Sequence, residues 1–329
     1  MATLYVEEQG AHVRKKDNQI LVTKEGQTLR EVPLAKLDQV VLMGRGVQIS
    51  TALLVDLIER GVPVTLTNQH GSKYYGSWNQ QSRFGELRSQ QTFLVHTSEQ
   101  ALALARTMIQ AKLHNQRALL QSTGWSSAGP AVGQITNALR DLAQAQTLDQ
   151  VRGYEGAAAN AYFSAWRAAL PPRWSFGGRA FYPPPDPVNA LLSFGYTLAL
   201  HDVLAAIQIV GLDPYLGTFH VIEAGRPSLA LDLLEEFRPL VVDRLVLELV
   251  RTEALPITGF ERPPQRPDAV YLGKDGRALF IDRYEALLQT RVPVAPNEHT
   301  ALRRVLQLQA QAIARVVRGE QAQYVGYTV

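Results

Sequence analysis

The residues best suited to carry chemistry lie in one stretch, residues 211–239, which reads GLDPYLGTFHVIEAGRPSLALDLLEEFRP. Two prolines bracket a short helical run within it, and Ser228 stands where an N-cap is expected. The stretch combines an imidazole, two guanidinium groups and an acidic trio: His220, Arg226, Arg238, Asp232, Glu235 and Glu236. On a helix the three acids fall at i, i+3 and i+4, so they crowd toward one side and repel one another unless a cation lies nearby. Arg238 is one candidate cation, and a divalent metal with His220 as a further ligand is another.

A second carboxylate stands where an apolar residue is expected. Residues 148–170 read as a helix whose inward stripe consists of Val151, Glu155, Ala158, Tyr162 and Trp166. A carboxylate in such a stripe is costly to bury unless it is paired, protonated or bound to a metal. Spacing alone leaves three answers open for Glu155: an ion pair with Arg167 or Arg179, a position at the rim of the stripe, or a metal.

Four motifs follow one another in a fixed order along the chain. They read EGAAANAYF, DPVNALLSFGYTL, GLDPYLGTFH and SLALDLLEEFRP, and they occupy residues 155–163, 186–198, 211–220 and 228–239. Together with GRGVQISTALLVDLIERGVPVTL at residues 44–66, they resemble the CRISPR-associated adaptation endonuclease family, the integrases that insert new spacers. The resemblance runs over essentially the whole chain.

The resemblance implies a metal site made of three residues. In that family a Glu, a His and a final acid hold the metal, and these positions fall on Glu155, His220 and Glu235. Many relatives carry Asp where this chain has Glu235, and Asp232 matches a second acid near the site. Two carboxylates and one imidazole suit Mn²⁺ well and Mg²⁺ adequately. The implied chemistry is cleavage of DNA and transesterification that joins a spacer 3′-hydroxyl to the repeat, both of them in-line attacks at phosphorus.

Basic and aromatic residues near these motifs are candidates for gripping the DNA phosphate. Tyr162, Arg179, Arg226 and Arg238 are expected to contact phosphate or to orient the metal ligands. Tyr162 lies at i+7 from Glu155, on the same helix face. A buried tyrosine more often finds a partner inside the protein. Arg238 has an alternative structural role, in which it pairs with Glu235 or Glu236 at its own helix end.

The periodicity predicts an α+β protein with a small β-rich domain at residues 1–88 and a larger α-helical catalytic domain at residues 89–329. Short β-branched runs separated by turns indicate strands near residues 4–8, 19–23, 28–34, 39–43 and 62–67, with one helix at 50–60. Helical patterns then follow near residues 99–121, 132–146, 148–170, 187–210, 228–236 and 297–318. The polar residues 82–92 are the expected inter-domain linker.

The composition of the chain bears on its binding partners and on the compartment in which it works. The 329 residues carry a net charge of +3, which permits a nucleic-acid partner without requiring one. There is no cysteine, which excludes disulfides and Cys-ligated zinc and suits a reducing cytoplasm. No uncharged apolar run approaches the roughly 20 residues of a membrane span. We therefore expect a soluble cytoplasmic protein with no membrane partner.

The resemblance also implies assembly. The β-rich domain is expected to form a symmetric homodimer by pairing sheets, and two dimers to flank a small ferredoxin-like partner protein on double-stranded DNA. Two other readings stay open. One is a non-catalytic DNA-binding scaffold of the same assembly, against which the complete set Glu155, His220 and Glu235 argues. The other is an unrelated metalloenzyme for a small phosphorylated substrate, which would want a phosphate-cradling Gly-rich loop that the dispersed glycines do not supply.

Overall fold

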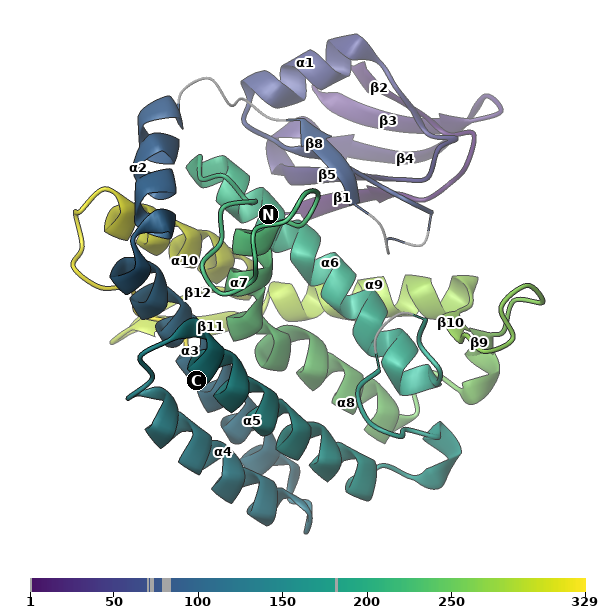
Figure 1. Ribbon diagram of the computed structural model, residues 1–329. Coiled ribbons are helices and arrows are strands. Elements are labelled where there is room, and N and C mark those ends of the chain that lie inside the picture. Colours follow the sequence, from purple (N-terminus) through teal and green to yellow (C-terminus); the bar gives the residue numbers. More distant parts are fainter. Residues whose placement is uncertain (1, 70, 72–73, 79–83, 181–182) are drawn as a thin grey trace.

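The computed structural model describes residues 2–69, 71, 74–78, 84–180 and 183–329. A strand-rich N-terminal region is followed by a helical region, as the α+β prediction requires (Figure 1). The strands and the helix of the first region are β1 (Ala2–Val6), β2 (His12–Lys16), β3 (Gln19–Lys24), β4 (Gln27–Pro33), β5 (Leu37–Met43), β6 (Gln48–Ile49), α1 (Thr51–Glu59), β7 (Val64–Thr67) and β8 (Tyr74–Trp78).

The N-terminal region contains two four-stranded sheets with α1 packed against them. The first sheet has the order β1-β5-β7-β8, with parallel pairs up to β7 and an antiparallel β8. The second has the order β4-β3-β2-β6, in which β2, β3 and β4 form an antiparallel meander. The turns between its strands contain Asp17 and Glu25, which adopt positive φ angles of 53° and 50°.

Strand β5 joins the two regions through the period-2 alternation of its side chains. Val40 and Leu42 pack into the core of the N-terminal region. Val41 and Met43, on the opposite face, belong to the core of the helical region. Both faces of this central strand are therefore buried, and an almost continuous apolar run is the expected sequence for such a strand.

The helical region is built around α6 (Pro187–Val210), which runs through its middle (Figure 1). The other helices of this region are α2 (Gly85–His96), α3 (Ser98–Thr123), α4 (Ala128–Leu142), α5 (Leu148–Ala169), α7 (Ser228–Phe237), α8 (Arg244–Thr252), α9 (Lys274–Leu288) and α10 (Leu302–Val317). Among the described residues, α6 is the helix long and apolar enough to cross a membrane, and 83% of its most apolar window is buried inside the protein. His201 and Asp202 interrupt the apolar run, which is why the sequence alone indicated no span.

Several local predictions were wrong. Residues 85–92 of the expected linker form the first part of α2, and residues 82–83 lie outside the described residues. The helical region also holds two small β-ladders, β9 (Phe260–Glu261) with β10 (Tyr271–Leu272) and β11 (Arg291–Ala295) with β12 (Glu298–Ala301). The second ladder takes the place of the first turn predicted for the last helix. Ser228 is the first helical residue of α7 and not its N-cap, because its hydroxyl donates to the carbonyl of Val221 at 2.9 Å.

Candidate active site

Helices α3, α5 and α7 and the loop before α7 meet at a cleft of about 570 Å³. The three predicted metal ligands all line this cleft, although they come from distant parts of the chain: Glu155, His220 and Glu235. Lys112, Arg167, Arg179 and Arg238 line the same cleft. With Asp243, which also lines it, the cleft combines an imidazole and three carboxylates with four basic side chains.

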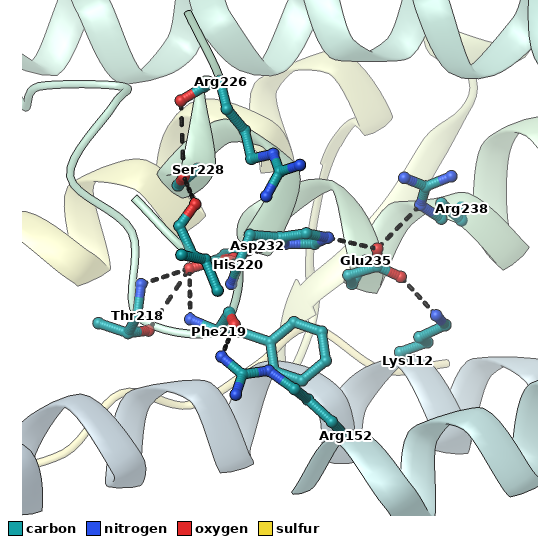
Figure 2. Close-up of polar contacts among 11 residues, drawn as sticks. Lys112, Arg152, Thr218, Phe219, His220, Arg226, Ser228, Asp232, Glu235 and Arg238 are labelled. Carbon is teal, nitrogen blue, oxygen red and sulfur yellow. Dashed lines mark hydrogen bonds and ion pairs between the residues drawn. The ribbon is translucent and has the colours of Figure 1, made fainter. Parts of the chain in front are cut away.

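The orientation of His220 is set by Asp232. The ring Nδ1 lies 2.7 Å from Asp232 Oδ1, and Nε2 lies 3.9 Å from Glu235 Oε1 (Figure 2). Because the carboxylate accepts the proton of Nδ1, the lone pair of a neutral imidazole is placed on Nε2, toward Glu235. A metal-binding histidine is held in the same way, by a carboxylate on its other ring nitrogen.

Asp232 also shapes the backbone that carries His220. Its fully buried carboxylate accepts the backbone N–H groups of Thr218 at 2.6 Å, Phe219 at 2.9 Å and His220 at 2.8 Å (Figure 2). Gly217 permits this approach, since a Cβ there would lie 2.5 Å from the backbone of Ser228 and 2.7 Å from the Asp232 carboxylate. The second acid of the motif thus positions the loop and the ring.

A lysine that the sequence analysis did not select joins the two glutamates. The ammonium of Lys112, on α3, lies 2.5 Å from Glu155 Oε1 and 2.5 Å from Glu235 Oε2. The partner of Glu155 is therefore Lys112, and not Arg167 or Arg179. Burial lowers the pKa of Lys112, but attraction by Glu235 and Glu155 outweighs it and raises the pKa above its ordinary value. The lysine is a resident cation between the two carboxylates.

Charge pairing keeps Glu235 ionised in spite of its burial. Desolvation raises its pKa, but Arg238, Lys112 and His220 together lower the pKa to about 2. The Nε of Arg238 lies 3.2 Å from Glu235 Oε1, which confirms the helix-end pairing considered for this arginine (Figure 2). Glu235 is thus a permanent anion at the centre of the cleft.

The donor set of the cleft fits a divalent cation. As arranged, no group of three or more acidic or histidine side chains in the described part of the chain is ready to hold a metal. Lys112 lies between Glu155 and Glu235, and Glu235 Oε2 is buried with no hydrogen bond of good geometry, its contact being the ion pair with Lys112. This oxygen, the Nε2 of His220 and the carboxylate of Glu155 are the hard and borderline ligands that Mg²⁺ and Mn²⁺ accept.

A layer of aromatic and acidic groups supports the arginines. The Tyr196 ring lies beneath the guanidinium groups of Arg238, at 4.4 Å, and Arg179, at 5.4 Å. The Tyr196 hydroxyl donates to Asp243 Oδ1 at 2.5 Å, and the Tyr162 hydroxyl donates to Asp243 Oδ2 at 2.9 Å. Burial raises the pKa of Asp243 to about 6, although both tyrosine hydrogen bonds oppose the shift.

Three residues of the sequence motifs lie elsewhere than predicted. Tyr162 is fully buried behind the cleft, and its hydroxyl binds Asp243 inside the protein. Direct contact with a phosphate is therefore not available to it. Arg226 lies on the loop before α7 and pairs with Glu223 at 2.8 Å, away from the cleft lining. Glu236 points away from Glu235, because neighbouring residues of a helix point about 100° apart, and its carboxylate binds Tyr324 and Tyr327 of the C-terminal tail. Burial raises the pKa of Glu236 to about 7.

The sequence held a signal for Lys112. In α3 it follows Met108 by four residues and precedes Asn115 by three, so it occupies a stripe whose other members are fully buried. A lysine in such a stripe requires a buried anion, as Glu155 required a cation. No comparable feature of the sequence selects Asp243. It lies at the end of a π-helical segment (Arg238–Asp243), which the α-helical spacing of apolar residues does not predict.

Comparison with known proteins places the chain in a family. The model of the family described as CRISPR associated protein Cas1 matches residues 4–286. A Thermus thermophilus protein named CRISPR-associated endonuclease Cas1 3 is 31% identical and covers 100% of this chain and 98% of its own. A Chlorobaculum tepidum protein named CRISPR-associated endonuclease Cas1 1 is 33% identical, with coverage of 97% and 95%. The chain belongs to the Cas1 family, which confirms the resemblance stated from its motifs.

Solved structures have the same fold. A Thermotoga maritima Cas1 protein superposes with a TM-score of 0.83 at 24% identity and covers 100% of both chains. A casposase bound to an integration product superposes with a TM-score of 0.85 at 21% identity and covers 99% of this chain and 93% of its own. At these identities the likeness concerns the fold.

Proposed function

We propose that this chain is a metal-dependent DNA endonuclease and integrase of CRISPR adaptation, which cuts DNA and joins a spacer 3′-hydroxyl to the repeat by transesterification. Family membership supports the nuclease class, since the relatives are named CRISPR-associated endonucleases. The casposase neighbour, named as bound to an integration product, supports strand transfer.

The observation that carries the proposal is the orientation of His220. Its Nδ1 is engaged by a buried carboxylate, and its Nε2 faces Glu235 across a cleft in which Lys112 already holds a positive charge between Glu155 and Glu235. A structural histidine does not need its second ring nitrogen to be directed toward a cleft and a second carboxylate. We assign Glu155, His220 and Glu235 as ligands of Mg²⁺ or Mn²⁺, and Asp232 as the residue that orients His220.

The bound cation supplies Lewis acidity for the phosphoryl oxygen and for the attacking water or 3′-hydroxyl. The chain's own residues do the rest. Arg238 and Arg179, stacked on Tyr196, present guanidinium donors to the phosphate, which they match in geometry. For a cation to bind between Glu155 and Glu235, Lys112 would have to give up its ion pairs with them, and its ammonium would then be available to neutralise the phosphate. One set of groups serves cleavage and joining, because both are in-line displacements at phosphorus.

We further propose the assembly that the family resemblance implies. Residues 1–88 form the dimerisation domain and residues 89–329 the catalytic domain. In the second sheet the edge strand β4 exposes five of its seven residues, including Leu29, and this edge is a candidate surface for pairing with a second copy. Neighbours named as Cas6-RT-Cas1–Cas2 and TtCas1–DNA complexes support a partner protein and DNA as binding partners. The family resemblance further implies that the DNA is double-stranded, that the partner is a small ferredoxin-like protein and that the assembly works in the cytoplasm.

The test is a cleavage and strand-transfer assay with Mg²⁺ or Mn²⁺ on a repeat-bearing plasmid and a fragment with a 3′-hydroxyl. Glu155→Gln, His220→Ala and Glu235→Gln are expected to abolish both reactions while salt-sensitive DNA binding survives. Glu223→Gln, an exposed acid on the same loop as His220, is the matched control and is expected to remain active. Wild-type protein that binds DNA without cutting or joining it, with the partner protein present, would establish the scaffold alternative.

A further inference from the structure

The C-terminal residues 323–329 lie against α3 and α7, outside the active-site cleft (Figure 1). They have no regular secondary structure, yet Tyr324 is only 5% exposed. The Tyr327 ring stacks on the Phe237 ring with the centroids 6.3 Å apart and the planes inclined by 10°. The segment is therefore held by specific contacts along its length.

Glu236 is the main anchor of this segment. Its fully buried carboxylate accepts the Tyr324 hydroxyl at 2.6 Å and the Tyr327 backbone N–H at 3.0 Å. It also accepts Nε2 of Gln309 at 3.2 Å, from α10. A buried carboxylate with these donors fixes both the tail and the rotation of α7 about its own axis.

Asn115 ties the tail to α3 at the same place. Its Nδ2 donates to the carbonyl of Glu236 and to the carbonyl of Tyr327, both at 2.9 Å. Its Oδ1 accepts the backbone N–H of Val329 at 3.3 Å. One buried amide thus bridges α3, α7 and the tail.

The same two helices carry the cation and the carboxylate of the cleft. On α3, Lys112 lies one turn before Asn115, and on α7, Glu235 directly precedes Glu236. We propose that residues 323–329 act as a strap that sets the spacing and rotation of α3 and α7 and so positions Glu235 for metal binding. Glu236, Asn115 and Tyr324 are positioning residues in this proposal, which rests on the proposed metal-dependent function.

Gly326 offers a sharp way to release the strap. A Cβ at this position would lie 2.6 Å from the Cβ of Ala111 and 3.3 Å from Glu236 Oε1. Because Ala111 belongs to the middle of α3, it cannot move aside, and the tail must lift. Ala111→Gly removes the obstructing atom and should restore the fit, even though glycine weakens the helix itself.

The experiment compares wild type, Gly326→Ala, Ala111→Gly and the double variant by Mn²⁺ titration calorimetry and by amide hydrogen exchange of the metal-free protein. Gly326→Ala is expected to bind Mn²⁺ about 10-fold more weakly, as do other changes behind a metal ligand, and to exchange faster in residues 228–237. The double variant should recover affinity and protection toward the wild-type values, because the clash is relieved. Val325→Ala, at a side chain that is 70% exposed, is the control. Tyr324→Phe, which removes one hydroxyl, is the milder second variant should Gly326→Ala not fold.

The outcomes separate the strap from the proposed function. Wild-type Mn²⁺ affinity in a Gly326→Ala protein whose tail has lost protection would overturn the proposal, and so would an unaltered tail in that variant. A double variant weaker than either single variant would point to general destabilisation and would equally overturn it. If the wild type binds no Mn²⁺, the proposed function fails, and faster exchange of residues 228–237 in Gly326→Ala still decides whether the tail holds α7.

Discussion

Replacement of Lys112 by methionine would remove the resident cation while keeping a side chain of similar length and an apolar stem. Two carboxylates would then face each other across the cleft with the ammonium gone. Removal of one partner from a buried ion pair costs about 3–5 kcal/mol. The low end applies here, because Arg238 still pairs with Glu235 and the Glu155 side chain is 21% exposed.

A loss of about 3 kcal/mol in a region of this size corresponds to a fall in Tm of about 6–12 °C for the metal-free protein. The effect on metal binding has the opposite sign. In wild type a cation bound at the proposed site would have to displace the Lys112 ammonium, whereas in Lys112→Met it would meet an uncompensated negative charge. If the full 3 kcal/mol is regained on binding, the affinity for Mn²⁺ rises about 100-fold.

The assay is differential scanning calorimetry with and without Mn²⁺, together with isothermal titration of Mn²⁺ into metal-free protein. Arg167→Met is the control, since it removes a positive charge that lines the same cleft but is exposed. We expect Lys112→Met to have a lower Tm without metal and a larger rise in Tm with it. A variant that loses stability and also loses Mn²⁺ affinity would refute the idea that lysine and metal compete for one position.

Three further predictions concern the groups around the cleft and the core. Asp232→Asn leaves an amide where N–H groups now donate, so Mn²⁺ affinity should fall about 10- to 100-fold in titration calorimetry, and unchanged affinity would exclude the orienting role. The raised pKa of Asp243, about 6, means that its stabilising contribution is full below pH 4 and is lost as the pH rises through 6. Asp243→Asn should therefore gain roughly 3 kcal/mol relative to wild type in urea unfolding between pH 4 and pH 8, and parallel pH profiles would contradict this. Burial lowers the pKa of His201 to about 4, so its contribution is lost as the pH falls from 6.5 through 4; His201→Phe should move acid unfolding to lower pH, and a midpoint that does not move would refute the assignment.

The helix boundaries illustrate how far local rules reach. The predicted helices at residues 148–170 and 187–210 agree with α5 and α6 to within one residue. Asp186 caps α6 by accepting the backbone N–H of Asn189, and Gly211 ends it with φ of +97°. Strand β2 was not predicted, because four of its five residues are exposed and show no strand pattern. It forms a strand because it pairs with β3, and such pairing cannot be read from its own residues.

The candidate site also has features that the sequence predicts and features that only helix packing decides. The residue types of Glu155, His220 and Glu235 and their order in the motifs are written in the sequence, and so is the requirement that a carboxylate in an apolar stripe find a partner. Which partner it finds is a matter of which helices meet. Lys112 lies 43 residues before Glu155 in the chain, and helix packing brings the two together.

The sequence by itself determined the family and the α+β architecture, and it supplied the acids and histidine of the candidate site, because these depend on composition, periodicity and motif order. The tertiary structure decided which way each side chain of the candidate site points and which residues lie next to it. It turned Asp232 toward His220 and Glu236 toward the C-terminal tail, although the two acids stand four residues apart on one helix. Contacts of α7 with the loop of residues 218–220 and with the C-terminal tail set these directions, and a one-dimensional pattern does not contain them.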